Sequence, residues 1–133
     1  MPLLNYTTTT EAEDNIAKIQ KTLVKHGARA VMTEYDDTGY VVAVSFRIRI
    51  GEQEIPFRLP SDWRPVQKVL ERQKTNSGRR VKHTQDQAIK VSWCIIKDWV
   101  EAQMAIIETE MVKMEQVFLP YAVTKTGETV YEK

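Results

Sequence analysis

Cysteine and histidine are almost absent from this sequence. One cysteine, Cys94, and two histidines, His26 and His83, occur among 133 residues. A single cysteine excludes a disulfide within the chain, and so few thiol and imidazole groups cannot form a tetrahedral zinc site without several carboxylates. We therefore expect neither a metal nor a cofactor, and we expect Cys94 to be a small buried apolar side chain.

Glycine is also scarce, and its placement excludes the common phosphate-binding loops. The five glycines all fall at expected turns or helix ends, and none belongs to a P-loop or a dinucleotide-binding motif. Asp36 and Asp37 precede a turn glycine, where aspartate is common. Glu101 and Glu108 share a helix face with lysines, as is typical of a solvated face. We assign no catalytic residue and do not expect an enzyme.

Long apolar runs are missing as well. No segment approaches the ~18 consecutive apolar residues of a membrane span. The N-terminal sequence MPLLNYTTTT lacks the basic and apolar regions of a signal peptide. We expect a cytoplasmic protein that makes no contact with a membrane.

Charge is balanced overall but concentrated in one segment. The 19 basic and 18 acidic side chains leave a formal net charge of +1. Residues 64–83 hold seven basic side chains against Glu71 alone, which gives a local net charge of +6. The basic residues are Arg64, Lys68, Arg72, Lys74, Arg79, Arg80 and Lys82. Such a segment indicates a polyanion or an acidic protein surface as partner.

The longest regular pattern predicts a helix over residues 84–114. Thr84 is a suitable N-cap, and Gln87 three residues later completes a capping box. No glycine or proline interrupts the segment. Its apolar residues cover an arc of about 220°, against the ~100° stripe of an ordinary surface helix. Because this surface must be covered, we expect a homo-oligomer with the helix in the interface. Trp99, near the middle of the arc, is expected in the core.

The remaining pattern predicts an α+β fold of order α-β-β-β-α-α. An N-terminal helix opens near Thr10 and stops at Gly27, and three strands then form an antiparallel meander up to Leu59. A short helix follows Ser61 and runs to about Lys74. The long helix completes the fold.

A tight turn sets the expected register of the second and third strands. The pair Gly51-Glu52 fits a two-residue type II′ hairpin turn. Phe46 then faces Phe57 on the core side of the sheet, because a slip by one residue would reverse the faces. Pro56 lacks an N–H for the ladder, which places the third strand at a sheet edge.

We expect one domain over residues 1–123, the usual number for a chain of this length. After the long helix, residues 117–121 (VFLPY) are predicted to anchor the chain in the core. Residues 124–133 (TKTGETVYEK) have the composition of a polar C-terminal tail, with a short strand around Val130.

Two basic surfaces are the candidate binding sites. The candidate nucleic-acid or anion-binding residues are Arg47, Arg49, Arg58, Arg79, Arg80 and Lys82. The first three share the outer face of the sheet, with Glu54 as the carboxylate among them, and the last three directly precede the long helix. Arginine binds phosphate bidentately, and the helix N-terminus adds positive potential. The alternatives are a solvated face or an acidic protein partner. No aromatic side chain interleaves with these residues, which disfavours base stacking.

Several blocks of the sequence carry a resemblance to a known group. They are YTTTTEAEDNIAKIQKTLVKHGARAV, IPFRLP, QAIKVSWCIIKDWVEAQMAIIE, VFLPY and TGETVYE, and they are spread along the chain from Tyr6 to Glu132. With these blocks the chain resembles small proteins encoded by bacteriophages and prophages. The resemblance implies a phage accessory protein acting in the cytoplasm of a bacterial host, and it assigns no site residues.

Two functional hypotheses follow. In the first, the protein binds DNA or RNA without catalysis through the arginine-rich sheet face and the basic loop. In the alternative, it acts as an anti-defence or host-takeover binder that sequesters a host protein or a small anionic ligand such as a signalling nucleotide. Salt dependence distinguishes them, because phosphate contacts release counterions.

Overall fold

The computed structural model describes residues 3–77 and 80–132 and confirms the predicted α+β class. Its elements are α1 (Ala12–Lys25), β1 (Ala28–Tyr35), β2 (Val41–Ile50), β3 (Gln53–Pro60), α2 (Trp63–Ser77), α3 (Gln85–Glu108), α4 (Met114–Phe118) and the 3-10 helix η1 (Leu119–Tyr121). Within these residues, no helix combines the length and apolar character needed to cross a membrane.

The chain divides into two compact units by its internal contacts. Unit 1 holds the residues up to Lys18 together with Ser61–Trp99, and unit 2 holds Ile19–Pro60 together with the residues from Val100 onward. Two of the three boundaries fall inside helices, so α1 and α3 each contribute to both units. The expectation of one domain over residues 1–123 stays a prediction.

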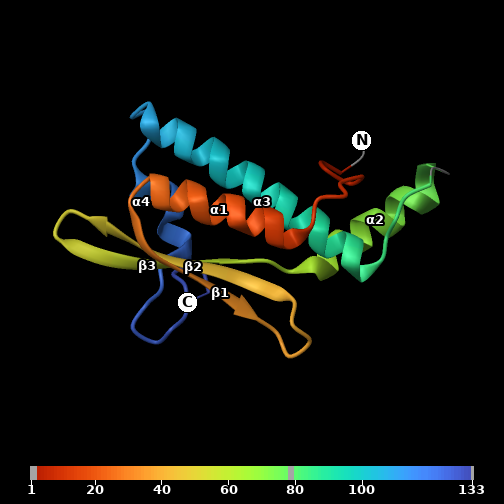
Figure 1. Cartoon of the computed structure of the whole chain (residues 1–133), viewed down its shortest axis with the longest axis horizontal. Helices are drawn as coiled ribbons and strands as arrows, with labels where there is room; N and C mark the ends of the chain where they lie inside the picture. Colours follow the sequence, from red (N-terminus) through yellow and green to blue (C-terminus); the bar gives the residue numbers. More distant parts are fainter. Residues whose placement is uncertain (1–2, 78–79, 133) are drawn as a thin grey trace. The chain divides into compact units, whose positions relative to one another are not determined.

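The sheet of unit 2 is an antiparallel meander. Its strands lie in the order β1-β2-β3, with the two hairpin turns at opposite ends (Figure 1). The predicted register of β2 and β3 is confirmed, since Phe46 pairs with Phe57. Gly51 has a φ of 64°, the left-handed conformation that the first position of a type II′ turn requires and that glycine adopts without strain.

One face of this sheet carries an aromatic core. The rings of Phe46 and Phe57 stack with centroids 5.3 Å apart, and the ring of Phe118 meets Phe46 edge-on at 5.6 Å. All three side chains are at most 2% exposed. The predicted anchoring by residues 117–121 is therefore confirmed at Phe118, while the neighbouring Leu119 is 56% exposed.

The core of unit 1 joins α2 to the first half of α3. Leu70 of α2 is buried against Ala88 and Val91 of α3, with Trp63 packed at the edge of this cluster. Trp93, further along α3, is 0% exposed. This core packs the first half of α3 against the middle of α2.

The C-terminal end of α3 differs from the prediction. The helix ends at Glu108 instead of residue 114. The hydroxyl of Thr109 donates to the carbonyl of Ile106 at 2.6 Å, and Glu110 has a φ of 63°. A left-handed residue cannot continue a right-handed helical ladder, so the segment splits into α3 and the short α4.

The predicted capping box at the start of α3 is half correct. The N–H of Gln87 donates to the hydroxyl of Thr84 at 3.2 Å, as expected. The side chain of Gln87 instead turns to the segment before α1, where its Nε2 donates to the carbonyls of Tyr6 and Thr8, each at 3.0 Å. Gln87 is 6% exposed, so its buried amide needs such partners. It thereby fastens the segment before α1 to α3.

The apolar arc of α3 is partly covered within the chain: its first half is mostly buried, while Ile95, Ile96 and Ile106 are half-buried. Trp93, not Trp99, is the fully buried tryptophan, and Trp99 is only half-buried. Cys94 is buried, as predicted. Among the described residues, no large apolar side chain of α3 is exposed. The expectation that α3 lies in an oligomer interface stays a prediction.

Phe118→Ala should lower the free energy of unfolding by about 3–5 kcal/mol, because the loss of a fully buried ring leaves a cavity. The matched variant Leu119→Ala removes an exposed side chain and should cost no more than about 0.5 kcal/mol. Urea unfolding followed by far-UV circular dichroism measures both. Equal midpoints for the two variants would contradict the aromatic core.

Candidate functional site

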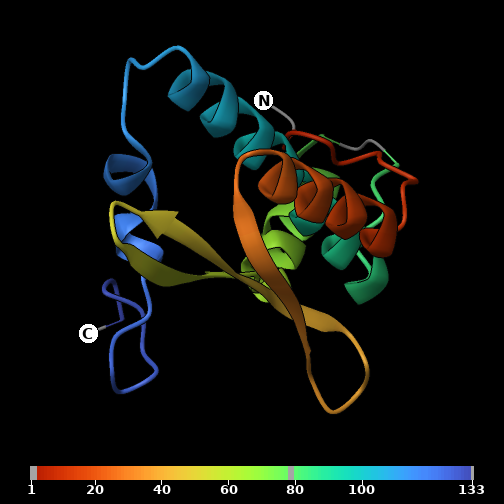
Figure 2. The ribbon, with the colours of Figure 1, turned by 60° about the vertical axis from the view of Figure 1, so that its left-hand side comes forward.

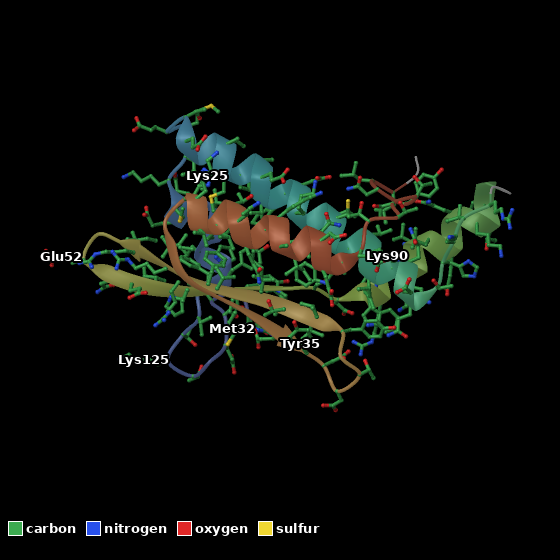
Figure 3. The ribbon with its side chains drawn as sticks, viewed as in Figure 1. Lys25, Met32, Tyr35, Glu52, Lys90 and Lys125 are labelled. Carbon is green, nitrogen blue, oxygen red and sulfur yellow. The ribbon has the colours of Figure 1, made fainter. Side chains whose placement is uncertain are left out.

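The face of the sheet opposite the aromatic core, here called the outer face, contains a groove of about 490 Å³. Its lining includes Ala30, Met32, Ser45, Arg47, Pro56 and Val123. The Met32 side chain points away from α1, the helix on which Lys25 is labelled in Figure 3. The volume is within the ~300–1,000 Å³ usual for small-ligand sites.

The C-terminal segment, residues 122–132, forms one wall of this groove. The N–H of Val123 donates to the carbonyl of Pro56 at 2.9 Å, and Val130 donates to Ala122 at 2.8 Å. Val123 also pairs with Thr129, whose side chain is 2% exposed. Figure 2 shows the segment beside the β2–β3 hairpin. The expected short strand around Val130 is wrong: Val130 lies in a turn, and the segment makes isolated bridges at Ala122, Val123 and Thr129.

Arg58 is bound to a carboxylate. Its Nε donates to Oε2 of Glu34 at 2.9 Å, and the hydroxyl of Ser45 donates to the same oxygen at 2.9 Å. The Arg58 and Glu34 side chains are 27% and 33% exposed. The expectation that Glu54 is the lone carboxylate on this face is wrong. Strand alternation places Glu34 on the same face as Ser45, so this partner could have been found from the sequence.

A further carboxylate acts on Arg58 from the C-terminal segment. Hydrogen bonds from the backbone and hydroxyl of Thr129 hold the pKa of Glu132 below its ordinary value, and the charge of Arg58 adds to the effect. The N–H of Thr129 donates to Oε1 of Glu132 at 2.9 Å. Glu132 is therefore ionised at neutral pH and reduces the positive potential around Arg58.

Arg47 and Arg49 are less compensated. Nε of Arg47 lies 3.8 Å from Oε1 of Glu54, and both side chains are largely exposed. Nε of Arg49 donates to the carbonyl of Gly51 at 3.3 Å. Among the described residues, Glu54 is the one carboxylate in ion-pair contact with either arginine. Two guanidiniums beside one carboxylate leave positive charge at this end of the outer face.

The second predicted surface belongs to unit 1. Arg79 lies outside the described residues. Arg80 and Lys82 are exposed and line a hollow of about 180 Å³ together with residues 7–9. Elsewhere in the basic segment, Arg64 pairs with Asp62 at 3.6 Å. The basic loop and the outer face thus lie in different units.

Other groups that could perform chemistry have structural roles. Oδ1 of Asp36 accepts hydrogen bonds from the hydroxyl and N–H of Thr38, which lower the pKa of its carboxyl and close the β1–β2 turn. Nε2 of His26 lies 2.8 Å from Oε1 of Glu108. In the part of the chain that the structure describes, no cluster of His, Cys, Asp and Glu could hold a metal ion.

Comparisons with protein-family models, curated proteins and solved structures found no match to this chain. The resemblance to phage-encoded proteins stays a prediction.

The Arg58–Glu34 pair should show a coupling energy of about 1 kcal/mol in a double-mutant cycle of alanine variants, because the pair is partly shielded from water. The exposed pair of Arg47 and Glu54 is the control and should give less than about 0.5 kcal/mol. Urea unfolding of the single and double variants supplies both cycles. Equal coupling in the two pairs would mean that Arg58 is as free as Arg47.

Proposed function

We propose that the protein binds single-stranded nucleic acid without catalysis, in the groove of the outer face. The observation that supports this most strongly is the position of Arg47 and Arg49. Arg47 lines the groove, and both residues extend from the same face of β2 with Glu54 as their shared carboxylate. An excess of positive charge at one end of a groove suits a nucleic-acid backbone.

The two arginines would hold phosphates. Alternate residues of a strand lie about 6.6–6.8 Å apart on one face, so Arg47 and Arg49 present guanidiniums at two successive positions along β2. Each planar guanidinium can donate to two phosphate oxygens. Arg58 is assigned a different role, because Glu34 already occupies its Nε–H. It stiffens the groove wall.

The groove floor would accept a base without reading its sequence. Ala30, Met32 and Val123 supply apolar contacts, and a methionine sulfur makes favourable contacts with aromatic rings. Tyr35 pairs with Val41 beyond the bulge of β1 and does not line the groove, so we propose weak binding that tolerates any base. With the phage resemblance, this describes an accessory protein that coats exposed single strands in a bacterial cytoplasm.

A short extended segment of a host protein is the second candidate. It is favoured by the neutralised Arg58–Glu34 pair, because paired charges beside apolar side chains resemble the rim and core of a protein interface. Binding of this kind would depend only weakly on ionic strength, since few counterions are released.

Arg47→Glu combined with Arg49→Glu should abolish binding to a labelled single-stranded oligonucleotide at about 50 mM salt. The wild type should bind with a slope of log K against log[salt] of about −1.4, the value for two phosphate contacts on a single strand. Fluorescence anisotropy at several salt concentrations measures both quantities.

Lys21→Glu combined with Lys25→Glu is the matched control. It makes the same change of charge at exposed positions of α1 and should leave binding nearly unchanged. Equal losses in the two double variants would show that only net charge matters. No binding by the wild type to any single-stranded DNA or RNA would refute the proposed function.

A further inference from the structure

The two edges of the sheet differ in how their backbone groups are used. The edge of β3 is paired with the C-terminal segment through Val123 and Ala122. β1 pairs with β2 alone. Within residues 3–77 and 80–132, no hydrogen bond reaches the main chain of β1 from its other side. β1 is therefore an open edge, a surface that pairs readily with another strand.

The hydrogen bond to Pro56 identifies which groups of β1 face this edge. Because Val123 donates to the carbonyl of Pro56, this carbonyl points away from β2. Its partner in β2 is Arg47. The main-chain N–H and C=O of Arg47 must then point toward β1, since these groups alternate in direction along an antiparallel strand. Ala30, opposite Arg47, is bonded to β2. The next residue, Val31, and likewise Thr33, face the open edge.

Irregularities in the pairing of β1 with β2 limit the part of β1 that can pair with a further strand. The pairing of β1 with β2 shifts between Ala28 and Ala30, and again between Glu34 and Tyr35. Bulges twist an edge and end regular pairing. Regular geometry is left over Ala30–Glu34, a stretch centred on Met32. A symmetric pairing of this stretch with itself places Met32 opposite Met32 of a second chain and Val31 opposite Thr33.

The side chains along this edge favour self-association. Met32 is 59% exposed and Tyr35 is 61% exposed, whereas α3 exposes no large apolar side chain among the described residues. β1 carries one basic residue near its start, Arg29, and one acidic residue near its end, Glu34. An antiparallel pair of identical strands brings the basic end of each near the acidic end of the other, and opposite charges across strands are stabilising.

We propose that two copies of the chain associate by antiparallel pairing of β1 with β1 across a two-fold axis beside Met32. Val31 of each copy exchanges both main-chain hydrogen bonds with Thr33 of the other, as in a hydrogen-bonded antiparallel pair. This interface replaces the one expected on the long helix. It does not depend on what the groove binds.

The pairing extends the outer face as well as the sheet. A two-fold axis perpendicular to the sheet keeps the outer faces of both copies on one side. Ala30, Met32 and Glu34 line the groove from β1, so the second copy would bring its own β1 side chains directly beside them. The two grooves would then form one longer channel with arginine pairs at both ends.

Light scattering of the wild type at high micromolar concentration should give twice the mass of one chain. Val31→Pro removes an N–H that faces the open edge and should give a monomer, while Val31→Ala keeps that N–H and should remain dimeric. β3 already tolerates a proline in the equivalent outward position, Pro56. Circular dichroism checks that both variants are folded.

A cysteine cross-link tests the register even if Val31→Pro fails to fold. Opposed residues at Met32 would have Cα atoms about 4.5 Å apart, within the ~4.4–6.8 Å range of disulfides. In a Cys94→Ala background, Met32→Cys should form a covalent dimer on mild oxidation. Met111→Cys, at a position 71% exposed, should not. A wild-type monomer overturns the proposal, and so does a dimer that cross-links equally at both positions.

Discussion

The pairing of β2 with β3 is the constraint on which the rest of unit 2 depends. The two-residue turn at Gly51 sets the register, and the register assigns every side chain of the hairpin to one face. Phe46 and Phe57 come together on one side, where Phe118 closes the core. Arg47 and Arg49 are thereby sent to the other side. A slip of one residue would exchange the two faces and bury guanidiniums in the aromatic core.

The same register decides how the edges of the sheet are used. Pro56 has no N–H. At its position the main-chain nitrogen points away from β2, so the missing N–H removes no hydrogen bond between β2 and β3. Its carbonyl is left to accept from Val123, so the C-terminal segment closes one edge and builds a wall of the groove. The groove and the open edge at β1 are therefore two results of one hydrogen-bonding pattern. Both proposals, strand binding and pairing of two copies, use surfaces that this pattern creates.

The sequence predicts this fold well where periodicity and turn chemistry agree. Alternation along β2 and the glycine at position 51 were sufficient to predict the pairing of β2 with β3. This pairing also predicted that the arginines lie on the outer face. Contacts between segments far apart in the chain could not be derived in this way. The side chain of Gln87 prefers the carbonyl of Tyr6 to its own helix cap, and the C-terminal segment pairs with β3. Strand alternation could have placed Glu34 on the outer face, but only the structure shows that its carboxylate binds Arg58.

We propose that the outer face of the sheet binds single-stranded nucleic acid. A titration of isotope-labelled protein with a short single-stranded oligonucleotide, followed by amide chemical shifts, tests this most directly. We expect the largest shifts at Ala30, Met32, Ser45, Arg47 and Arg49, with little change at Lys21 and Lys25 on α1. Shifts concentrated at Arg80 and Lys82 with the outer face unchanged, or no shifts at all, would contradict it.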